Sequence, residues 1–195
     1  MMIREMNREQ LVQQLEKVTK NLSTPSTSSL ELYDFKAILE NQIEELDKQA
    51  AYLWEASEVG KKYESCNFEN FNPEGFETQY KVAKKFTKDF EYESGKGLLM
   101  YGTYGTGKTH LAVAIARELL KERGCSVWFK TFGELLQDLR NSFKDGATKE
   151  ISRKYFATDV LVMDDLGKEK LSDWANEQLF NIVNERYKNK KTIII

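Results

Sequence analysis

The first third of the chain has apolar residues at helical spacing. In residues 1–22 they recur every three or four positions, which predicts a short amphipathic helix. Residues 23–29 are mostly serine and threonine with one proline, a composition that cannot continue a helix and predicts a linker. The pattern then predicts a second, longer helix from about residue 30 to Gly60.

The second predicted helix carries a leucine at every seventh position, in a stripe that other apolar residues widen. The stripe consists of Leu32, Leu39, Leu46 and Leu53, with Phe35, Ile43 and Ala50 beside them. Two interpretations stay open. Either the helix packs on its own domain or on the first helix, or the stripe is a seam for a partner or a second copy of the chain.

From residue 66 onward, short apolar runs alternate with helical patterns. The apolar runs are residues 97–101, 126–130, 159–164 and 192–195, and the helical patterns cover 108–123, 132–143, 148–156 and 173–188. This alternation predicts βαβ units and a parallel sheet. The expected fold class is therefore α/β, with a helical N-terminal region over residues 1–65 and a second domain over residues 66–195.

Composition and charge narrow the choice of partners. Of the 195 residues, 41% are hydrophobic, enough for a core, and 29 basic residues nearly balance 31 acidic ones. The net charge of −2 gives no global attraction to nucleic acid, so any DNA contact needs a local patch. Two cysteines and one histidine are too few for a structural zinc site. Without a signal peptide or an apolar run of about 18 residues, a cytoplasmic protein with no membrane partner is expected.

A complete phosphate-loop motif, G-x-x-x-x-G-K-[ST], stands between a predicted strand and a predicted helix. Its residues are Gly102, Thr103, Tyr104, Gly105, Thr106, Gly107, Lys108 and Thr109. Glycines let successive N–H groups point at phosphate oxygens, and the following helix adds its positive end. Lys108 is expected to reach the β- and γ-phosphates of ATP, and the Thr109 hydroxyl to ligate Mg²⁺. His110 follows in the helix and is expected to border the nucleotide as a packing residue.

A Mg²⁺ site also needs an acidic side chain, and a pair of aspartates later in the chain can supply it. The apolar run 160–163 ends in Asp164 and Asp165, at the carboxyl end of a strand, where α/β proteins place their ligands. Asp164 is expected to hold Mg²⁺ through its water shell, and Asp165 to polarise the attacking water. The predicted catalytic residues are thus Lys108, Asp164 and Asp165, and the predicted metal-binding residues are Thr109 and Asp164.

Three stretches carry a resemblance to a known family. They are Asn67-Phe68-Glu69-Asn70-Phe71-Asn72, residues 101–111 around the phosphate loop, and the run from Asp164-Asp165-Leu166-Gly167 through Asp173-Trp174 to Arg186-Tyr187. Residues 66–195 resemble the AAA+ domain of bacterial and phage helicase loaders, the DnaC/DnaI group. The resemblance implies an ATP-dependent protein that delivers a DnaB-type replicative helicase onto single-stranded DNA, with residues 1–65 docking on the helicase. Further copies of this chain, in a homo-oligomer, are another expected partner.

The chain departs from this family at its end. It stops at Ile195, in the expected fourth strand, whereas the family continues with a sensor residue, an arginine finger and further helices. The resemblance therefore implies a C-terminally truncated domain that binds nucleotide and hydrolyses it poorly, since loss of an arginine finger can cost about 10³-fold or more in rate. Arg186 is expected in solvent or at the edge of the core rather than as the finger.

Two groups of basic side chains are candidates for contacting single-stranded DNA. One consists of Lys84, Lys85 and Lys88, and the other of Lys144, Lys149, Arg153 and Lys154 with the aromatic residues Phe143, Tyr155 and Phe156. Basic residues mixed with aromatic ones suit a mode that combines backbone contact and stacking. The alternative is that both groups are ordinary solvated helix faces.

Two rival functions stay open beside helicase loading. The ATPase helpers of insertion-sequence transposases, the IstB group, share the loop and the fold. They typically have Asp-Glu where this chain has Asp164-Asp165, and they lack the Asp173-Trp174 stretch. The other rival is a non-hydrolysing interaction module, in which the ATPase domain is vestigial and residues 1–60 do the work.

Overall fold

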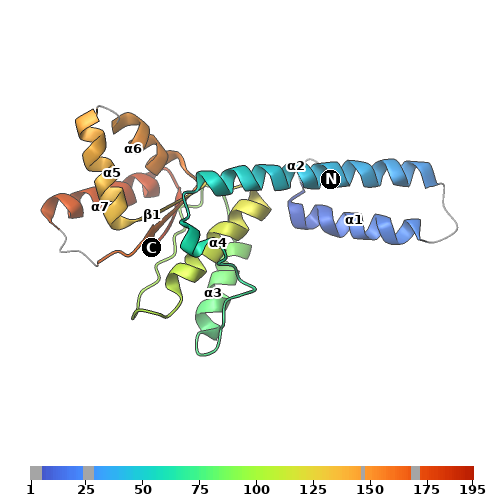
Figure 1. Cartoon of the computed structure of the whole chain (residues 1–195), viewed down its shortest axis with the longest axis horizontal. Coiled ribbons are helices and arrows are strands. Elements are labelled where there is room, and N and C mark those ends of the chain that lie inside the picture. Colours follow the sequence, from blue (N-terminus) through green and yellow to red (C-terminus); the bar gives the residue numbers. More distant parts are fainter. Residues whose placement is uncertain (1–5, 24–28, 146–147, 168–171) are drawn as a thin grey trace.

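A computed structural model describes residues 6–23, 29–145, 148–167 and 172–195. Most of the predicted linker lies outside these ranges. The elements are α1 (Arg8–Leu22), α2 (Ser29–Ala56), the short 3₁₀ helix η2 (Lys61–Tyr63), α3 (Glu77–Lys88), α4 (Lys108–Arg123), β1 (Val127–Thr131), α5 (Phe132–Asp145), α6 (Thr148–Ala157), β2 (Val160–Asp164), α7 (Asp173–Lys188) and β3 (Thr192–Ile194). Figure 1 shows α1 and α2 as a hairpin that projects from an α/β domain.

The sheet is parallel, as the alternation of strands and helices predicts. Its three strands lie in the order β1-β2-β3. The predicted strand 97–101 forms only an isolated parallel bridge in the sheet, between Leu98 and Ile194. The Leu98 N–H donates to the Ile193 carbonyl at 2.9 Å, and the Ile195 N–H to the Leu98 carbonyl at 2.9 Å. The segment that enters the phosphate loop therefore lies beside β3, and β3 separates it from β2.

Two apolar layers cover the two faces of this sheet. Val127, Phe129 and Val162 pack with α4, whose residues from Leu111 to Ala116 are all buried. The alternate strand residues, such as Trp128, pack with α5, α6 and α7 on the other face. Successive strand side chains point to opposite faces, so one short apolar strand can supply both layers. None of the described helices combines the length and apolarity needed to cross a membrane.

The hairpin has its own small core. Leu39 of α2 is buried together with Leu11 and Val18 of α1, and Leu32 and Leu46 pack around them. At the other end of the stripe, Ala50 and Leu53 instead pack against the core of the α/β domain. The leucine stripe is therefore occupied within the chain, which contradicts its interpretation as an open seam for a partner. The long helix has a second helix beside it, and that helix buries the same face.

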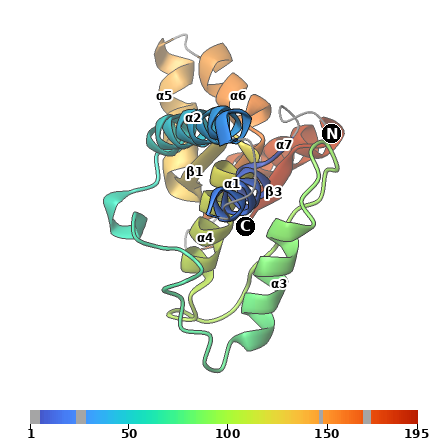
Figure 2. The same ribbon diagram turned by 90° about the vertical axis from the view of Figure 1, so that its right-hand side faces the viewer.

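Polar contacts join the hairpin to the α/β domain. The Glu9 N–H of α1 donates to the carboxylate of Glu122 in α4 at 2.9 Å. Just after α2, the Ser57 carbonyl accepts the Phe129 N–H of β1 at 2.8 Å. Glu58 then pairs with Lys130 of β1 at 2.8 Å. Burial opposes the charge on both groups, but their mutual hydrogen bond lowers the pKa of Glu58 and raises the pKa of Lys130. Figure 2 looks along the hairpin and shows α1 and α2 nearly end on, in front of the α/β domain.

Candidate phosphate and metal site

The phosphate loop turns through conformations that glycine adopts most readily. Gly102, Gly105 and Gly107 have φ angles of 140°, 77° and 79°. At Gly107 a side chain is also excluded by space, because a Cβ there would lie 2.5 Å from Cε2 of Phe71. Gly107 is the residue from which α4 starts, so its left-handed conformation directs the first N–H groups of α4 toward the loop.

Lys108 folds back over this loop. Its ammonium donates to the Gly102 carbonyl at 3.0 Å and to the Thr103 carbonyl at 2.7 Å. The loop thus surrounds the ammonium group with its own oxygens. A phosphate oxygen in the same place would replace these neutral acceptors with an anionic one, which forms the stronger hydrogen bond.

Thr109 and Asp164 meet although 55 residues separate them in the sequence. The Thr109 hydroxyl lies 2.9 and 3.1 Å from the two carboxylate oxygens of Asp164. A hydroxyl and a carboxylate are the oxygen ligands that Mg²⁺ prefers, so this pair fits the predicted metal site. Asp165 is exposed and has a φ of 60°, uncommon for a residue other than glycine, and this turns the chain sharply after β2.

These residues line one cavity of about 730 Å³, within the size range of small-molecule sites. Its walls include Lys108, Thr109 and His110 on one side, and Asp164 and Asp165 on the other. Of the predicted nucleotide-binding residues, Thr103 does not line this cavity; it borders a neighbouring pocket on the far side of the loop.

Lys62 and Tyr63, the last two residues of η2, also line the cavity. No motif marks them, and they lie about 40 residues before the phosphate loop. Only the path of the chain after α2 brings them there.

The lead-in segment before α3 supports the loop from behind. Phe71 is buried, stacks on Tyr80 at 5.8 Å between ring centroids, and meets the His110 ring edge to face at 5.2 Å. A ring nitrogen of His110 lies 2.8 Å from the Asn67 carbonyl. His110 is therefore packed between the lead-in segment and the loop. Phe71, which the sequence marks only as part of the family resemblance, also supports the loop, because it fills the space beside Gly107.

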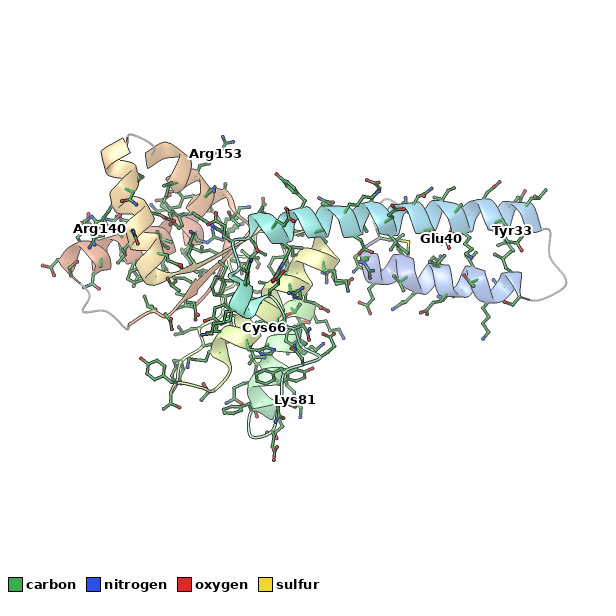
Figure 3. The ribbon with its side chains drawn as sticks, viewed as in Figure 1. Tyr33, Glu40, Cys66, Lys81, Arg140 and Arg153 are labelled. Atoms are coloured by element: carbon green, nitrogen blue, oxygen red, sulfur yellow. The ribbon has the colours of Figure 1, made fainter. Side chains whose placement is uncertain are left out.

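The candidate DNA-binding groups do not form one surface. Tyr155 is fully buried against Trp128, so its predicted stacking on DNA is wrong. Lys85 pairs with Asp89 at 2.5 Å and Lys154 with Glu58 at 3.4 Å. The structure describes the backbone but not the side chains of Phe143, Lys144 and Lys149. Figure 3 shows Arg153 on α6 at the top of the molecule and α3, marked by Lys81, at the bottom.

The chain is similar to known proteins both in sequence and in structure. The chain is 33% identical over 161 residues to the phage-like element PBSX protein XkdC of Bacillus subtilis (strain 168), covering 76% of this chain and 60% of XkdC. It is 35% identical over 99 residues to the replicative helicase loader DnaI of the same strain, covering 50% of this chain and 32% of DnaI. A crystal structure of the DnaC helicase loader superposes with a TM-score of 0.66 at 34% identity, over 69% of this chain and 78% of that one.

The chain thus spans about 60% of XkdC and about a third of DnaI. Its parallel sheet and covering helices match the AAA+ domain of the helicase loaders, with a helical N-terminal region added. The family model described as IstB-like ATP binding protein matches residues 2–195, nearly the whole chain. With a complete phosphate loop in an AAA+ fold, the chain belongs to the IstB-like ATP-binding proteins.

Proposed function

We propose that this protein binds Mg²⁺-ATP at residues 102–109 and uses it to load a DnaB-type replicative helicase onto single-stranded DNA. The observation that carries the proposal is the contact of Thr109 with Asp164 beside Lys108, in one cavity of an AAA+ fold. Two of the similar proteins, DnaI and DnaC, are named helicase loaders, and this supports the step from ATP binding to helicase loading.

Each residue has a separate task in this proposal. The loop N–H groups and Lys108 orient the phosphates, while Thr109 and Asp164 hold the metal ion. When bound, Mg²⁺ supplies neutralisation of the charge that develops on the phosphate oxygens. Asp165 polarises the attacking water. Positioning and charge neutralisation account for most of phosphoryl-transfer catalysis. These few groups therefore suffice for a simple ATPase site.

Nucleotide binding is tested with Lys108→Ala and a fluorescent ATP analogue. Loss of a charge-assisted contact should weaken binding by at least about tenfold. Lys121→Ala, on the exposed side of the same helix, is the matched control and should bind as the parent does. Equal affinity of the Lys108→Ala variant and the parent chain would remove the site assignment.

The two aspartates are expected to separate binding from turnover. Asp164→Asn should weaken Mg²⁺-dependent binding, whereas Asp165→Asn should keep binding and lose phosphate release. If both variants bind and turn over like the parent, the acidic pair has no part in the site. If the parent chain binds ATP but never releases phosphate, the non-hydrolysing interaction module becomes the better description.

The hairpin is the proposed helicase-docking part. Since α1 covers the leucine stripe, the surface left for docking is the exposed side of α2. Leu30, Tyr33 and Ile38 there are 80%, 55% and 48% exposed. Apolar side chains in such positions favour contact with a groove or helix of a partner.

A transposase helper is the second candidate. The match to the IstB-like family model over residues 2–195 favours it. Capture of purified helicase, and not of a transposase, by the full chain would support loading; the reverse result would support the transposase helper.

A further inference from the structure

The connector between α2 and the α/β domain contributes to the phosphate cavity. Lys62 and Tyr63 of η2 line the same space as Lys108 and Asp164. We infer that Lys62 is a second phosphate-binding cation, which contacts the polyphosphate of the nucleotide from the side opposite the glycine-rich loop. This inference rests on the proposed ATP binding and adds a residue outside the phosphate-loop motif.

The backbone that carries Lys62 is held firmly. The Tyr63 N–H donates to the Gly60 carbonyl at 2.8 Å, and the Tyr63 ring packs 5.7 Å from the ring of Phe129 in β1. On the other side, Arg117 of α4 donates to the Cys66 carbonyl at 3.1 Å and to the Glu64 carbonyl. The connector is thus attached to the helix that starts at the phosphate loop. Only the Lys62 side chain needs to move to meet a ligand, which keeps the entropy cost of binding small.

The charge of the cavity favours a second cation. Its lining holds Lys62 and Lys108 together with Asp164 and Asp165, so the charges of these four side chains sum to zero. ATP remains anionic even when Mg²⁺ is bound. Because Asp164 faces the metal ion, Lys62 and Lys108 are the two lysines of this lining that can meet the phosphate charge, beside the positive end of α4.

Lys62 is available for this contact. Among the residues that the structure describes, no carboxylate lies within ion-pair distance of it, whereas Lys130 and Lys154 near the same connector both pair with Glu58. Its ammonium lies 5.2 Å from the centre of the Tyr63 ring, a contact that is weak at an exposed site. The neighbouring Lys61 is also exposed but does not line the cavity, so it serves as a matched control.

The test compares the parent chain of 195 residues with its Lys62→Ala, Lys62→Arg and Lys61→Ala variants. The affinities for Mg²⁺-ATP, Mg²⁺-ADP and adenosine are measured by calorimetry at low and high salt. Lys62→Ala should weaken ATP binding by roughly tenfold. Adenosine binding should be unchanged, because it has no phosphate. The loss should shrink as salt screens the charge, Lys62→Arg should bind like the parent, and Lys61→Ala should stay within about twofold of it.

Each other outcome has a distinct meaning. If the parent chain does not bind ATP, the proposed function itself fails. If the parent binds and Lys62→Ala binds equally well, only the role of Lys62 is refuted. An equal loss in Lys61→Ala would assign the effect to general surface charge, and a parallel loss of adenosine binding would assign it to the fold or the base; both overturn the inference.

Discussion

Gly107 combines two constraints at one position of the phosphate loop. Its φ of 79° strains any other residue, and its missing Cβ leaves the space that Phe71 occupies. Gly107→Ala should therefore lower stability by about 1–3 kcal/mol and abolish nucleotide binding. Gly105 has a similar φ of 77°, but a Cβ there would have nothing within 4 Å. Gly105→Ala therefore measures the cost of backbone strain alone. Thermal unfolding should show the larger loss for Gly107→Ala; equal losses would mean that the contact with Phe71 has no energetic weight.

Arg186 lies in the interior, so its expected position in solvent or at the edge of the core is wrong. It is 0% exposed, and its guanidinium donates to carbonyls where α6 ends and β2 and β3 begin. The acceptors are those of Tyr155, Thr158, Asp159 and Thr192, at 2.5, 3.0, 3.1 and 2.5 Å. Burial lowers its pKa to about 10, which still leaves it charged at neutral pH. The terminal carbonyls of a helix lack partners within that helix, and this cation satisfies them.

Lysine cannot replace that fork of donors. Arg186→Lys and Arg186→Met should each destabilise the protein by about 2–4 kcal/mol in urea unfolding, because buried carbonyls lose their partners. Lys188→Met, exposed on the same helix, is the control and should change stability by less than about 0.5 kcal/mol. A similar small change in the Arg186 variants would show that water satisfies these carbonyls instead.

At the scale of elements, the packing of α1 on α2 can be tested separately from the stability of the α/β domain. Leu39 is buried against α1, while the adjacent Ile38 is largely exposed. Leu39→Asp should detach α1 from α2, because an unpaired carboxylate in an apolar core costs several kcal/mol. Ile38→Asp should leave the hairpin intact. Limited proteolysis should cut the hairpin only in the Leu39 variant, with ATP binding retained; protection of both variants would contradict the assigned packing.

The predicted elements agree with the structure where the local pattern is long. The helices predicted at 108–123 and 173–188 have the observed bounds of α4 and α7. The segment 97–101 has the pattern of a strand and hydrogen-bonds with residues 193–195, but it forms only a single bridge, between Leu98 and Ile194. Periodicity indicates which side of an element is apolar. It does not indicate how many residues of that element pair with a neighbouring strand.

For the whole molecule, the proposed loading role predicts that one exposed surface of the hairpin docks on a helicase. The structure leaves the outer side of α2 for docking, so Tyr33→Glu with Ile38→Glu should abolish capture of a replicative helicase in a pull-down while ATP binding persists. Tyr52→Glu, exposed on α2 nearer the α/β domain, is the matched control and should still capture it. Full capture by the double variant would exclude this surface as the docking site.

The chemistry of the phosphate loop could be read from eight contiguous residues, because its function needs little beyond glycines, a lysine and a threonine in order. The α/β class likewise follows from alternating local patterns. Tertiary structure alone decided that α1 covers the leucine stripe, that Arg186 and Tyr155 are interior, and that Lys62 reaches the phosphate cavity. Each of these depends on which segments meet across long sequence separations. A helix face looks the same in sequence whether a neighbouring helix or a partner protein buries it.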